Sequence, residues 1–350
     1  MATASPSPDN VSAERQSALV WNYVRGFHAT HLMATGIEAG LFDAIDRHGV
    51  AAPAELAAEL GLHAPYVTTW CRTACAHELL DADGTEKFRL APFMREILVA
   101  RGDPRHIGAY LTVLQRHGGP DLADHARRYR DGSAFSFQEH GAGFSGLVAD
   151  TTAGLQDFAA RRLLPGVPDV RQRLETGCRL LDVGCGAGGW MIRIAQAWSQ
   201  VTCHGVDVDT HAIAAARERL AAAGLADRVS VALVGGEAAQ AEAGFDIATM
   251  FEVLHEIPVV ARAEVMAQTF RALKPGGILF ILDETYPSSH AQLRQPEHAF
   301  SIQTGYAEVT WGNVVPTREE QEALLTGAGF RDLDRNLIAG MFTLLVARKP

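Results

Sequence analysis

One short segment of the chain reads Leu180-Leu181-Asp182-Val183-Gly184-Cys185-Gly186-Ala187-Gly188-Gly189-Trp190. Its apolar run stops at Gly184 and an amphipathic run begins at Trp190, a pattern that predicts a buried strand, a glycine turn and a helix. Gly184, Gly186 and Gly188 remove side chains from the turn, so a ligand can approach the backbone closely. The N–H groups that open the helix then point at whatever is bound.

The spacing of the glycines alone does not identify that ligand. Gly184, Gly186 and Gly189 also fit the G-x-G-x-x-G pattern of dinucleotide-binding enzymes. Asp182 favours a different ligand, because a carboxylate two residues before the first glycine repels a pyrophosphate but accepts a hydrogen bond from an ammonium group. The segment therefore resembles the Asp-x-Gly-x-Gly-x-Gly signature of class I S-adenosylmethionine (SAM) methyltransferases, whose cofactor carries an amino acid in place of phosphates.

Length and composition limit the other possibilities. The 350 residues, 47% of them apolar, are enough for two domains. No apolar run is long enough to span a membrane, and residues 1–10 predict a disordered tail, not a signal peptide. The five cysteines form no metal-like array, which predicts a reducing cytoplasm. The net charge of −10 argues against nucleic acid as a partner and favours a small-molecule substrate.

Residues 11–100 predict a winged helix, in which helices are followed by a hairpin. The expected elements are two helices between residues 11 and 45 that break near Gly36 or Gly40, helices at 53–60 and 66–77, and a hairpin at 79–90 that turns at Asp83-Gly84. Winged helices often bind DNA, but residues 1–100 carry 7 basic against 12 acidic residues, and the helix at 66–77 offers only Arg72. We therefore expect dimerisation or the walling of a substrate pocket.

Residues 101–170 predict a helical connector with scattered phenylalanines, which we expect to pack onto the following domain; lining of a ligand cleft is the alternative. Residues 171–350 form the expected catalytic domain, in which strand and helix patterns alternate. Alternation of this kind predicts a parallel sheet with helices on both faces and ligands at the carboxyl ends of its strands. Strands are expected near 179–183, 201–206, 229–234, 245–251, 276–283 and 341–348.

Three further residues are candidates for holding a nucleoside cofactor. Asp207 ends the second expected strand, where an acid accepts hydrogen bonds from both ribose hydroxyls, of SAM or of a nicotinamide cofactor. Resemblance to the methyltransferases implies that Glu237 accepts from the adenine amino group, although Asp is more usual there. Phe251, after the fourth strand, packs either against adenine or into the core.

Two later motifs strengthen this resemblance. Leu254-His255-Glu256, and then Lys274-Pro275-Gly276-Gly277 before the fifth strand, are similar to SAM-dependent O-methyltransferases that join a winged-helix dimerisation domain to a Rossmann-like catalytic domain. The similarity spans residues 27–349 and implies an α/β fold, SAM as cofactor, a homodimer and a small-molecule acceptor. Three alternatives remain open, namely a nicotinamide-dependent dehydrogenase, methylation of carbon, and a ligand-sensing regulator without catalysis.

His255 stands where that family keeps its general base. Methyl transfer requires an acceptor aligned with the sulfonium and the removal of its proton, and histidine exchanges a proton near neutral pH. Asp283 matches the first of two acids that flank the base in plant-type members, but Val315 stands at the second position and cannot orient an imidazole. A structural histidine is the alternative interpretation.

This departure keeps methylation of carbon open, which in some similar bacterial enzymes involves a metal. We expect no metal here, and the less favoured alternative is a site made by His255 with Glu308, His290 or His298. The insertion from Glu284 to Pro316 follows a strand end and is expected to cover the acceptor. The candidates for acceptor contacts are Tyr286, Tyr306 and Trp311 from this insertion, and Phe27 and His28, with Tyr23, from a partner chain.

Overall fold

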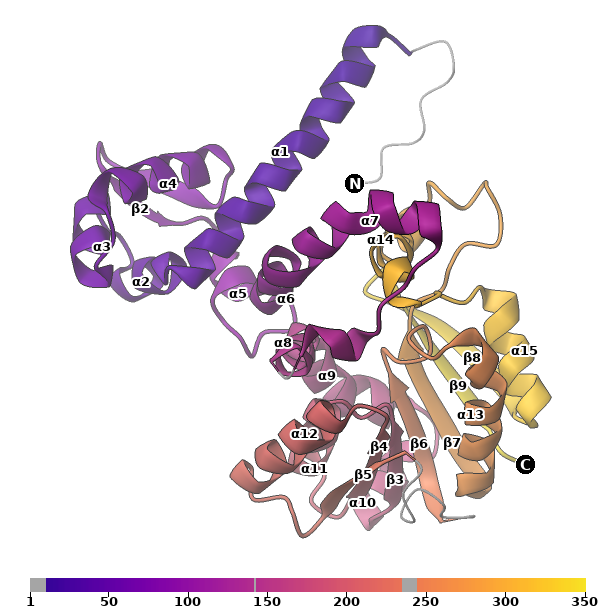
Figure 1. The fold of residues 1–350 in the computed structure, drawn as a ribbon. Coiled ribbons are helices and arrows are strands. Elements are labelled where there is room, and N and C mark those ends of the chain that lie inside the picture. Colours follow the sequence, from indigo (N-terminus) through magenta and orange to yellow (C-terminus); the bar gives the residue numbers. More distant parts are fainter. Residues whose placement is uncertain (1–10, 142, 235–243) are drawn as a thin grey trace. The chain divides into compact units, whose positions relative to one another are not determined.

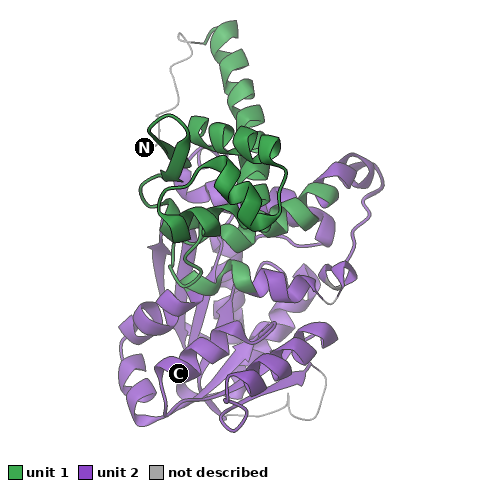
Figure 2. Ribbon diagram, turned by 90° about the vertical axis from the view of Figure 1, so that its left-hand side faces the viewer, with its two compact units in different colours: residues 1–120, 150–155 green, residues 121–149, 156–350 purple. Residues whose placement is uncertain are grey.

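The computed structural model describes residues 11–141, 143–234 and 244–350. The chain divides into two compact units, one made of Met1–Pro120 with Asp150–Leu155 and the other of Asp121–Ala149 with Gln156–Pro350 (Figure 2). Residues of the connector expected at 101–170 therefore belong to both units. No helix within the described residues is long and apolar enough to cross a membrane.

The first unit consists of helices and one small hairpin (Figure 1). Its elements are α1 (Ala13–Glu38), α2 (Leu41–His48), α3 (Pro53–Leu60), α4 (Ala64–Ala76), the antiparallel strands β1 (Leu80–Asp83) and β2 (Lys87–Leu90), α5 (Met94–Leu98) and α6 (Gly108–Val113). Gly40 ends the first helix in a left-handed conformation (φ 72°), and Pro65 lies in the first turn of α4, where its missing N–H costs nothing. The winged-helix pattern of helices and hairpin is confirmed.

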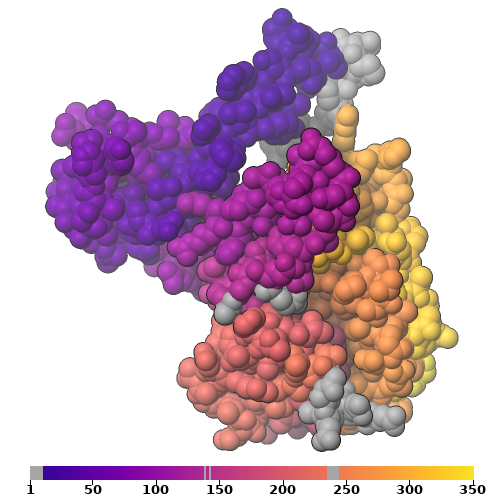
Figure 3. Space-filling view, viewed as in Figure 1, coloured from indigo at the N-terminus to yellow at the C-terminus, as the bar shows by residue number. Residues whose placement is uncertain are grey.

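The core of this unit requires a glycine inside the long first helix. A Cβ at Gly36 would lie 2.3 Å from Trp70 Cζ2, so any side chain there would displace the indole ring. Trp70 packs edge-on against Phe42 and donates its indole N–H to the Leu32 carbonyl oxygen at 3.0 Å. The N-terminal turns of α1 stand clear of the rest of the unit (Figure 3) and expose Trp21, Tyr23 and Phe27.

The second unit is built on a seven-stranded sheet with the order β5-β4-β3-β6-β7-β9-β8. Its strands are β3 (Arg179–Val183), β4 (Thr202–Asp207), β5 (Val229–Leu233), β6 (Phe245–Phe251), β7 (Leu273–Asp283), β8 (Arg331–Ile338) and β9 (Phe342–Arg348). Its helices are α7 (Gly119–Asp131), α8 (Phe144–Thr151), α9 (Ala153–Phe158), α10 (Val170–Thr176), α11 (Gly189–Ala197), α12 (Thr210–Ala222), α13 (Val259–Ala272), α14 (Ala299–Glu308) and α15 (Arg318–Ala328). Of these, α7, α8 and α9 each include residues of the first unit. Helices α11 and α12 pack against β4 and β5, and α13 packs against β7 (Figure 1).

The sheet is mixed, so the expectation of a wholly parallel sheet was wrong. Strands β3 to β7 are parallel, whereas β9 runs antiparallel to both β7 and β8. A tight turn at Ala339 and Gly340, both with positive φ, joins β8 to β9, and a hairpin can join only antiparallel strands. Strand β8 was not among the expected strands because it is a polar edge strand, Arg331–Ile338, without an apolar run.

The insertion before α15 leaves and rejoins the sheet at one place. Tyr286 pairs with Thr317, and its N–H donates to the Pro316 carbonyl oxygen at 3.0 Å. Thr317 then caps α15, and Glu320 completes a capping box. The segment between Tyr286 and Thr317 therefore forms a long insertion after β7 whose two ends are paired with each other.

Candidate active site

The glycine turn between β3 and α11 adopts a backbone that only glycine accepts easily. Gly184, Gly186 and Gly188 have φ values of 72°, 51° and 76°. A Cβ at Gly184 would also lie 2.4 Å from Val253 Cγ1, so this residue is needed for packing as well as for the turn. A Cβ at Gly186 would meet nothing within 4 Å, which leaves its side of the turn open to a ligand.

Asp182, at the end of β3, is 2% exposed and lies below this turn. Its Oδ1 accepts a hydrogen bond from Thr249 Oγ1 at 2.7 Å, and Thr249 in turn accepts from Trp190 Nε1 at 3.1 Å. Burial raises the pKa of Asp182 to about 7. An ammonium group beside Asp182 would favour the ionised carboxylate. Thr249 and Trp190 hold this acid in place, and sequence reasoning did not single out either role.

Asp207 ends β4 and holds the turn from the other side. Its Oδ2 accepts from the Gly186 N–H and its Oδ1 from the Asp209 N–H, both at 2.8 Å. Burial raises the pKa of Asp207 above its usual range. A carboxylate accepts about four hydrogen bonds, so Asp207 keeps capacity for ribose hydroxyls after these two. Asp209 caps α12 by accepting from the His211 N–H.

The remaining cofactor candidates differ in what the structure shows. Phe251 is buried and its ring packs against the Trp190 ring, with centroids 4.9 Å apart. Packing of this kind agrees with the core role that was the alternative for this residue. Glu237 lies outside the described residues.

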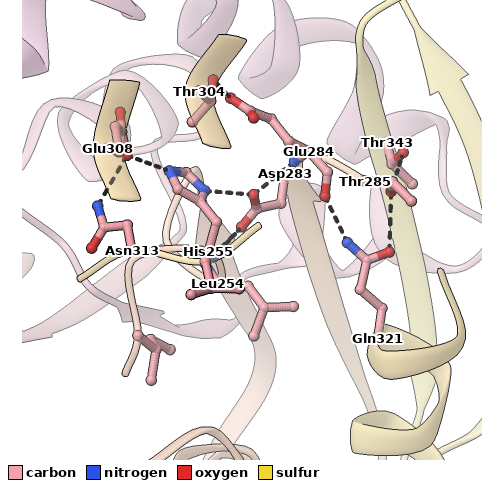
Figure 4. Close-up of polar contacts among 12 residues, drawn as sticks. Leu254, His255, Asp283, Glu284, Thr285, Thr304, Glu308, Asn313, Gln321 and Thr343 are labelled. Atoms are coloured by element: carbon pink, nitrogen blue, oxygen red, sulfur yellow. Dashed lines mark hydrogen bonds and ion pairs between the residues drawn. The ribbon is translucent and has the colours of Figure 1, made fainter. Parts of the chain in front are cut away.

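His255 follows the carboxyl end of β6 and is 4% exposed. Its Nδ1 lies 2.7 Å from Asp283 Oδ1, at the end of the adjacent strand β7 (Figure 4). Asp283 also accepts from the backbone N–H groups of Glu284, Leu254 and His255, at 2.7, 2.6 and 3.3 Å. Because an aspartate only accepts, Nδ1 carries a proton and the exchangeable position of the imidazole is Nε2.

Glu308, from α14, faces that second nitrogen. Its Oε2 lies 3.7 Å from His255 Nε2 and accepts from Asn313 Nδ2 at 2.9 Å (Figure 4). Burial by itself lowers the pKa of His255, but the charge and hydrogen bond of Asp283, followed by the charges of Glu308 and Glu284, raise it well above its usual value. Sequence reasoning named Glu308 beside His255 only in the alternative metal site. It missed Glu308 as a flanking acid, since the expected position held Val315.

Three more glutamates surround this imidazole. Burial raises the pKa of Glu256 to about 8 and that of Glu284 to about 7, and it raises the pKa of Glu252 well above its usual value. Glu252 has a positive φ of 56°, a strained backbone for a residue with a side chain. Sequence reasoning gave no role to any of the three.

Arg262, from α13, ties the backbone around the base together. Its guanidinium donates to the carbonyl oxygens of Ile257 and His255 at 2.9 and 3.1 Å and also to that of Val314. The Val314 N–H donates back to the His255 carbonyl oxygen at 3.3 Å. One buried cation therefore joins the turn that carries His255 to the end of the insertion.

One group of potential metal ligands includes the base. Within the described residues, His255, Glu256 and Glu308 each offer one ligand atom, and these atoms lie within 4.8 Å of one another. His298 is not in this group, and its Nδ1 lies 3.2 Å from the Thr285 carbonyl oxygen. Within the described residues, the alternative metal site with a second histidine as ligand is therefore not formed.

The aromatic candidates for acceptor contacts come from both units of the chain. Trp311 donates its indole N–H to Asp121 Oδ2 at 3.2 Å and packs edge-on against His140. Tyr306 is largely exposed, with its ring edge-on to that of His125. Phe27, with His28, belongs to α1 of the other unit and is 61% exposed. A Cβ at Gly305 would lie 2.9 Å from Tyr286 Cε2, so Tyr286 covers this turn of α14.

Comparison with known proteins identifies both parts of the chain. A family model described as a methyltransferase domain matches residues 181–279, and one described as an O-methyltransferase dimerisation domain matches residues 21–98. The first match contains the glycine turn, Asp182, Asp207 and His255. The chain is a SAM-dependent methyltransferase.

The methyltransferase is similar along most of its length to a curated relative and to solved structures. The 3-hydroxy-5-methyl-1-naphthoate 3-O-methyltransferase of Streptomyces sahachiroi is 26% identical over 276 residues, which cover 75% of this chain and 76% of that protein. Human N-acetylserotonin methyltransferase in complex with SAM has a TM-score of 0.78 at 16% identity, over 98% of this chain and 99% of the other. Mitomycin 7-O-methyltransferase has a TM-score of 0.75 at 18% identity, over 97% of this chain and 99% of the other.

SAM is the cofactor of the methyltransferase, and the residues around the glycine turn fit it. The open side of Gly186, the buried carboxylate of Asp182 and the free acceptor capacity of Asp207 suit a ligand with an amino group and a ribose. The expected fold class, a helical dimerisation domain followed by a Rossmann-like domain, is confirmed, and the sheet of the second domain is mixed, not parallel throughout. The dimerisation domain supports a homodimer.

Proposed function

We propose that this methyltransferase methylates a hydroxyl oxygen of a small molecule, with His255 as the general base. The hydrogen bond between His255 Nδ1 and Asp283 Oδ1 carries the proposal, because it fixes the ring and leaves Nε2 for the acceptor proton. The names of the Streptomyces relative and of mitomycin 7-O-methyltransferase, which describe transfer to oxygen, support this choice of acceptor atom.

The chain performs three tasks in this reaction. When bound, SAM supplies an electrophilic methyl group. His255 Nε2 takes the proton of the acceptor hydroxyl as the oxygen attacks, and Asp283 stabilises the imidazolium that forms. Glu308, whose Oε2 lies 3.7 Å from Nε2, receives that proton afterwards and passes it to solvent from its partly exposed side chain.

The same proposal assigns the binding residues and domains. Asp182 binds the SAM amino group, and Asp207 binds the ribose. Phe251, which is buried beside Trp190, packs against the adenine ring with its other side. Glu237 accepts a hydrogen bond from the adenine amino group. The glycines at 184, 186 and 188 let the cofactor approach the backbone. Residues 11–100 form the dimerisation domain, 101–170 the connector and 171–350 the SAM-binding domain.

Replacing the base provides the test. His255→Ala removes the proton acceptor but leaves the glycine turn intact, so we expect methyl transfer to fall by roughly 10²- to 10⁴-fold while the Kd for SAM stays unchanged. His211→Ala, at an exposed histidine of α12, is the control. Turnover close to that of the unsubstituted enzyme in His255→Ala would remove the base assignment.

Methylation of carbon with a metal is the second candidate, and the grouping of His255, Glu256 and Glu308 is the observation in its favour. The two candidates predict different results with chelator. A base-catalysed O-methyltransferase keeps its rate in EDTA, and its product carries the methyl group on oxygen. A metal-assisted enzyme loses its rate in EDTA and regains it with a divalent ion. Carbon-13 NMR of product made from labelled SAM distinguishes the two products.

A further inference from the structure

More acidic residues lie near the carboxyl ends of β6 and β7 than the proposed reaction uses. The register pairs Phe251 with Leu282, so Glu252 and Asp283 lie side by side where these parallel strands end. Glu284 follows directly, Glu256 lies one residue beyond the base, and Glu308 comes from α14. Five carboxyl groups therefore gather around one imidazole.

Within the described chain, none of these five acids forms an ion pair with lysine or arginine. His255 is their common cationic neighbour. Arg262 is the nearby guanidinium, but its hydrogen bonds go to the carbonyl oxygens of Ile257, His255 and Val314. Buried carboxylates are costly unless they are paired, so this site favours the arrival of positive charge.

Two of the five acids have oxygen atoms that no group among the described residues satisfies. Asp283 accepts four hydrogen bonds, and Glu308 accepts one from Asn313. Glu284, 2% exposed, uses Oε1 to accept from Thr304 Oγ1 at 2.8 Å, but its Oε2 is buried without a partner (Figure 4). Glu252 Oε1 is also buried without a partner.

Glu252 Oε1 and Glu284 Oε2 do not orient the base, which Asp283 does. A buried acceptor without a donor destabilises the folded protein, more so when it is charged, so two such atoms beside a reaction centre are unfavourable unless a ligand satisfies them. The acidic surroundings of both atoms favour a donor that is also a cation.

We propose that Glu252 and Glu284 form a subsite for a protonated amine carried by the acceptor. The acceptor would thus be a hydroxylated amine whose hydroxyl reaches His255 Nε2 while its ammonium group donates to Glu252 Oε1 and Glu284 Oε2. This inference rests on the proposed methylation of a hydroxyl group and names the class of molecule that bears it. It makes Glu252 and Glu284 specificity-determining residues.

Three phenols that differ in the charge of one substituent test the proposal. Tyramine carries an ammonium group, 4-ethylphenol is neutral and 4-hydroxyphenylacetate is an anion. Their binding to the full-length protein saturated with S-adenosylhomocysteine is measured by calorimetry at pH 7.5 in EDTA, so that no metal ion bridges the carboxylates. We expect tyramine to bind at least about tenfold more tightly than 4-ethylphenol, and 4-hydroxyphenylacetate to bind most weakly.

Glu252→Gln and Glu284→Gln keep the size of each side chain and remove its charge. Each should weaken tyramine binding by about tenfold and leave 4-ethylphenol binding and the Kd for SAM unchanged. Glu297→Gln, at an exposed glutamate of the insertion, is the matched control and should change nothing. Unchanged SAM affinity in the two variants also shows that they are folded.

The outcomes separate this inference from the proposed function. Equal affinity for tyramine and 4-ethylphenol, or no binding of either, overturns the amine subsite. A loss of SAM affinity in Glu252→Gln or Glu284→Gln overturns it as well, because the carboxyls would then serve the cofactor. Binding to the product complex does not require catalysis, so a preference for tyramine that persists in His255→Ala supports the subsite whatever the fate of the base assignment.

Discussion

Asp283 accepts hydrogen bonds from both the side chain and the backbone of His255. Its Oδ1 lies 2.7 Å from Nδ1 of the ring, and its Oδ2 accepts from the His255 N–H at 3.3 Å and the Leu254 N–H at 2.6 Å. One carboxylate at the end of β7 therefore fixes both the turn after β6 and the tautomer of the imidazole.

Asp283→Asn should lower methyl transfer by roughly 10²- to 10⁴-fold, since an amide cannot accept from every donor that Asp283 serves or stabilise the imidazolium. Transfer of radiolabelled methyl from SAM measures the rate, and the Kd for SAM should change little. Asp246→Asn, which removes a carboxylate paired with Lys274, is the control for loss of an acid. A rate for Asp283→Asn equal to that of the control would contradict the orienting role.

Glu308→Gln should shift the pH dependence of the rate. The charge of Glu308 helps to raise the pKa of His255, so its removal lowers that pKa. The base acts in its deprotonated form, and the rate therefore rises with pH through the pKa of His255. We expect the acidic limb of the kcat/KM profile to move to lower pH in the variant. An unmoved limb would show that Glu308 does not act on the base.

Asp182→Asn should weaken SAM binding by roughly 10- to 100-fold. The amide oxygen can still accept from Thr249, so the substitution removes mainly the charge that meets the SAM amino group. Calorimetry with SAM provides the measurement, with Asp227→Asn at an exposed aspartate as the control. If the two variants bind SAM equally well, Asp182 does not contact the cofactor.

The free protein should lose stability as the pH rises from about 4 to 8. Folding raises the pKa values of Asp182 and Glu284 to about 7 and of Glu256 to about 8, from 3.8 for Asp and 4.5 for Glu. These groups bind protons more tightly when folded, so the stability they contribute is complete below the unfolded values and is lost as the pH passes the folded ones. Thermal unfolding across this range should show a fall of several degrees in Tm. Glu284→Gln should reduce the fall in Tm with pH. A fall as steep as that of the unsubstituted protein would contradict the raised pKa of Glu284.

Phe27→Glu should convert the homodimer to a monomer. Trp21, Tyr23 and Phe27 of α1 are 64%, 68% and 61% exposed, and a dimerisation domain is expected to cover such aromatic side chains. Size-exclusion chromatography with light scattering measures the mass. Val260→Glu, at a valine of α13 that is 95% exposed, is the control for a new surface charge. A dimer of unchanged stability in Phe27→Glu would place the interface elsewhere.

The elements that the sequence predicted correctly are those with strong local signals. The strand at 179–183 and the glycine turn depend on residues close together in the chain. Strand β8 has no such signal, because an exposed edge strand needs no apolar run. Its antiparallel pairing with β9 follows from the turn between them.

The surroundings of His255 were less accessible to sequence reasoning. Asp283 could be matched because it directly ends a strand. Glu308 lies on α14 at the end of a long insertion, and nothing in the local pattern indicates that α14 turns this side chain toward the base. Glu252 and Glu284 read as ordinary polar residues after strands, and only their burial sets them apart.

The insertion between Tyr286 and Thr317 begins and ends at adjacent positions of the backbone. A segment anchored in this way can change in length at little entropic cost and without shifting β7 or α15. Glu308, Asn313 and Val314 are the parts that reach His255 or its backbone, and they cluster near its end. Exchange of residues 287–307 with those of a homologue thus offers a route to altered acceptor range in an engineered enzyme, with the base and the cofactor turn retained.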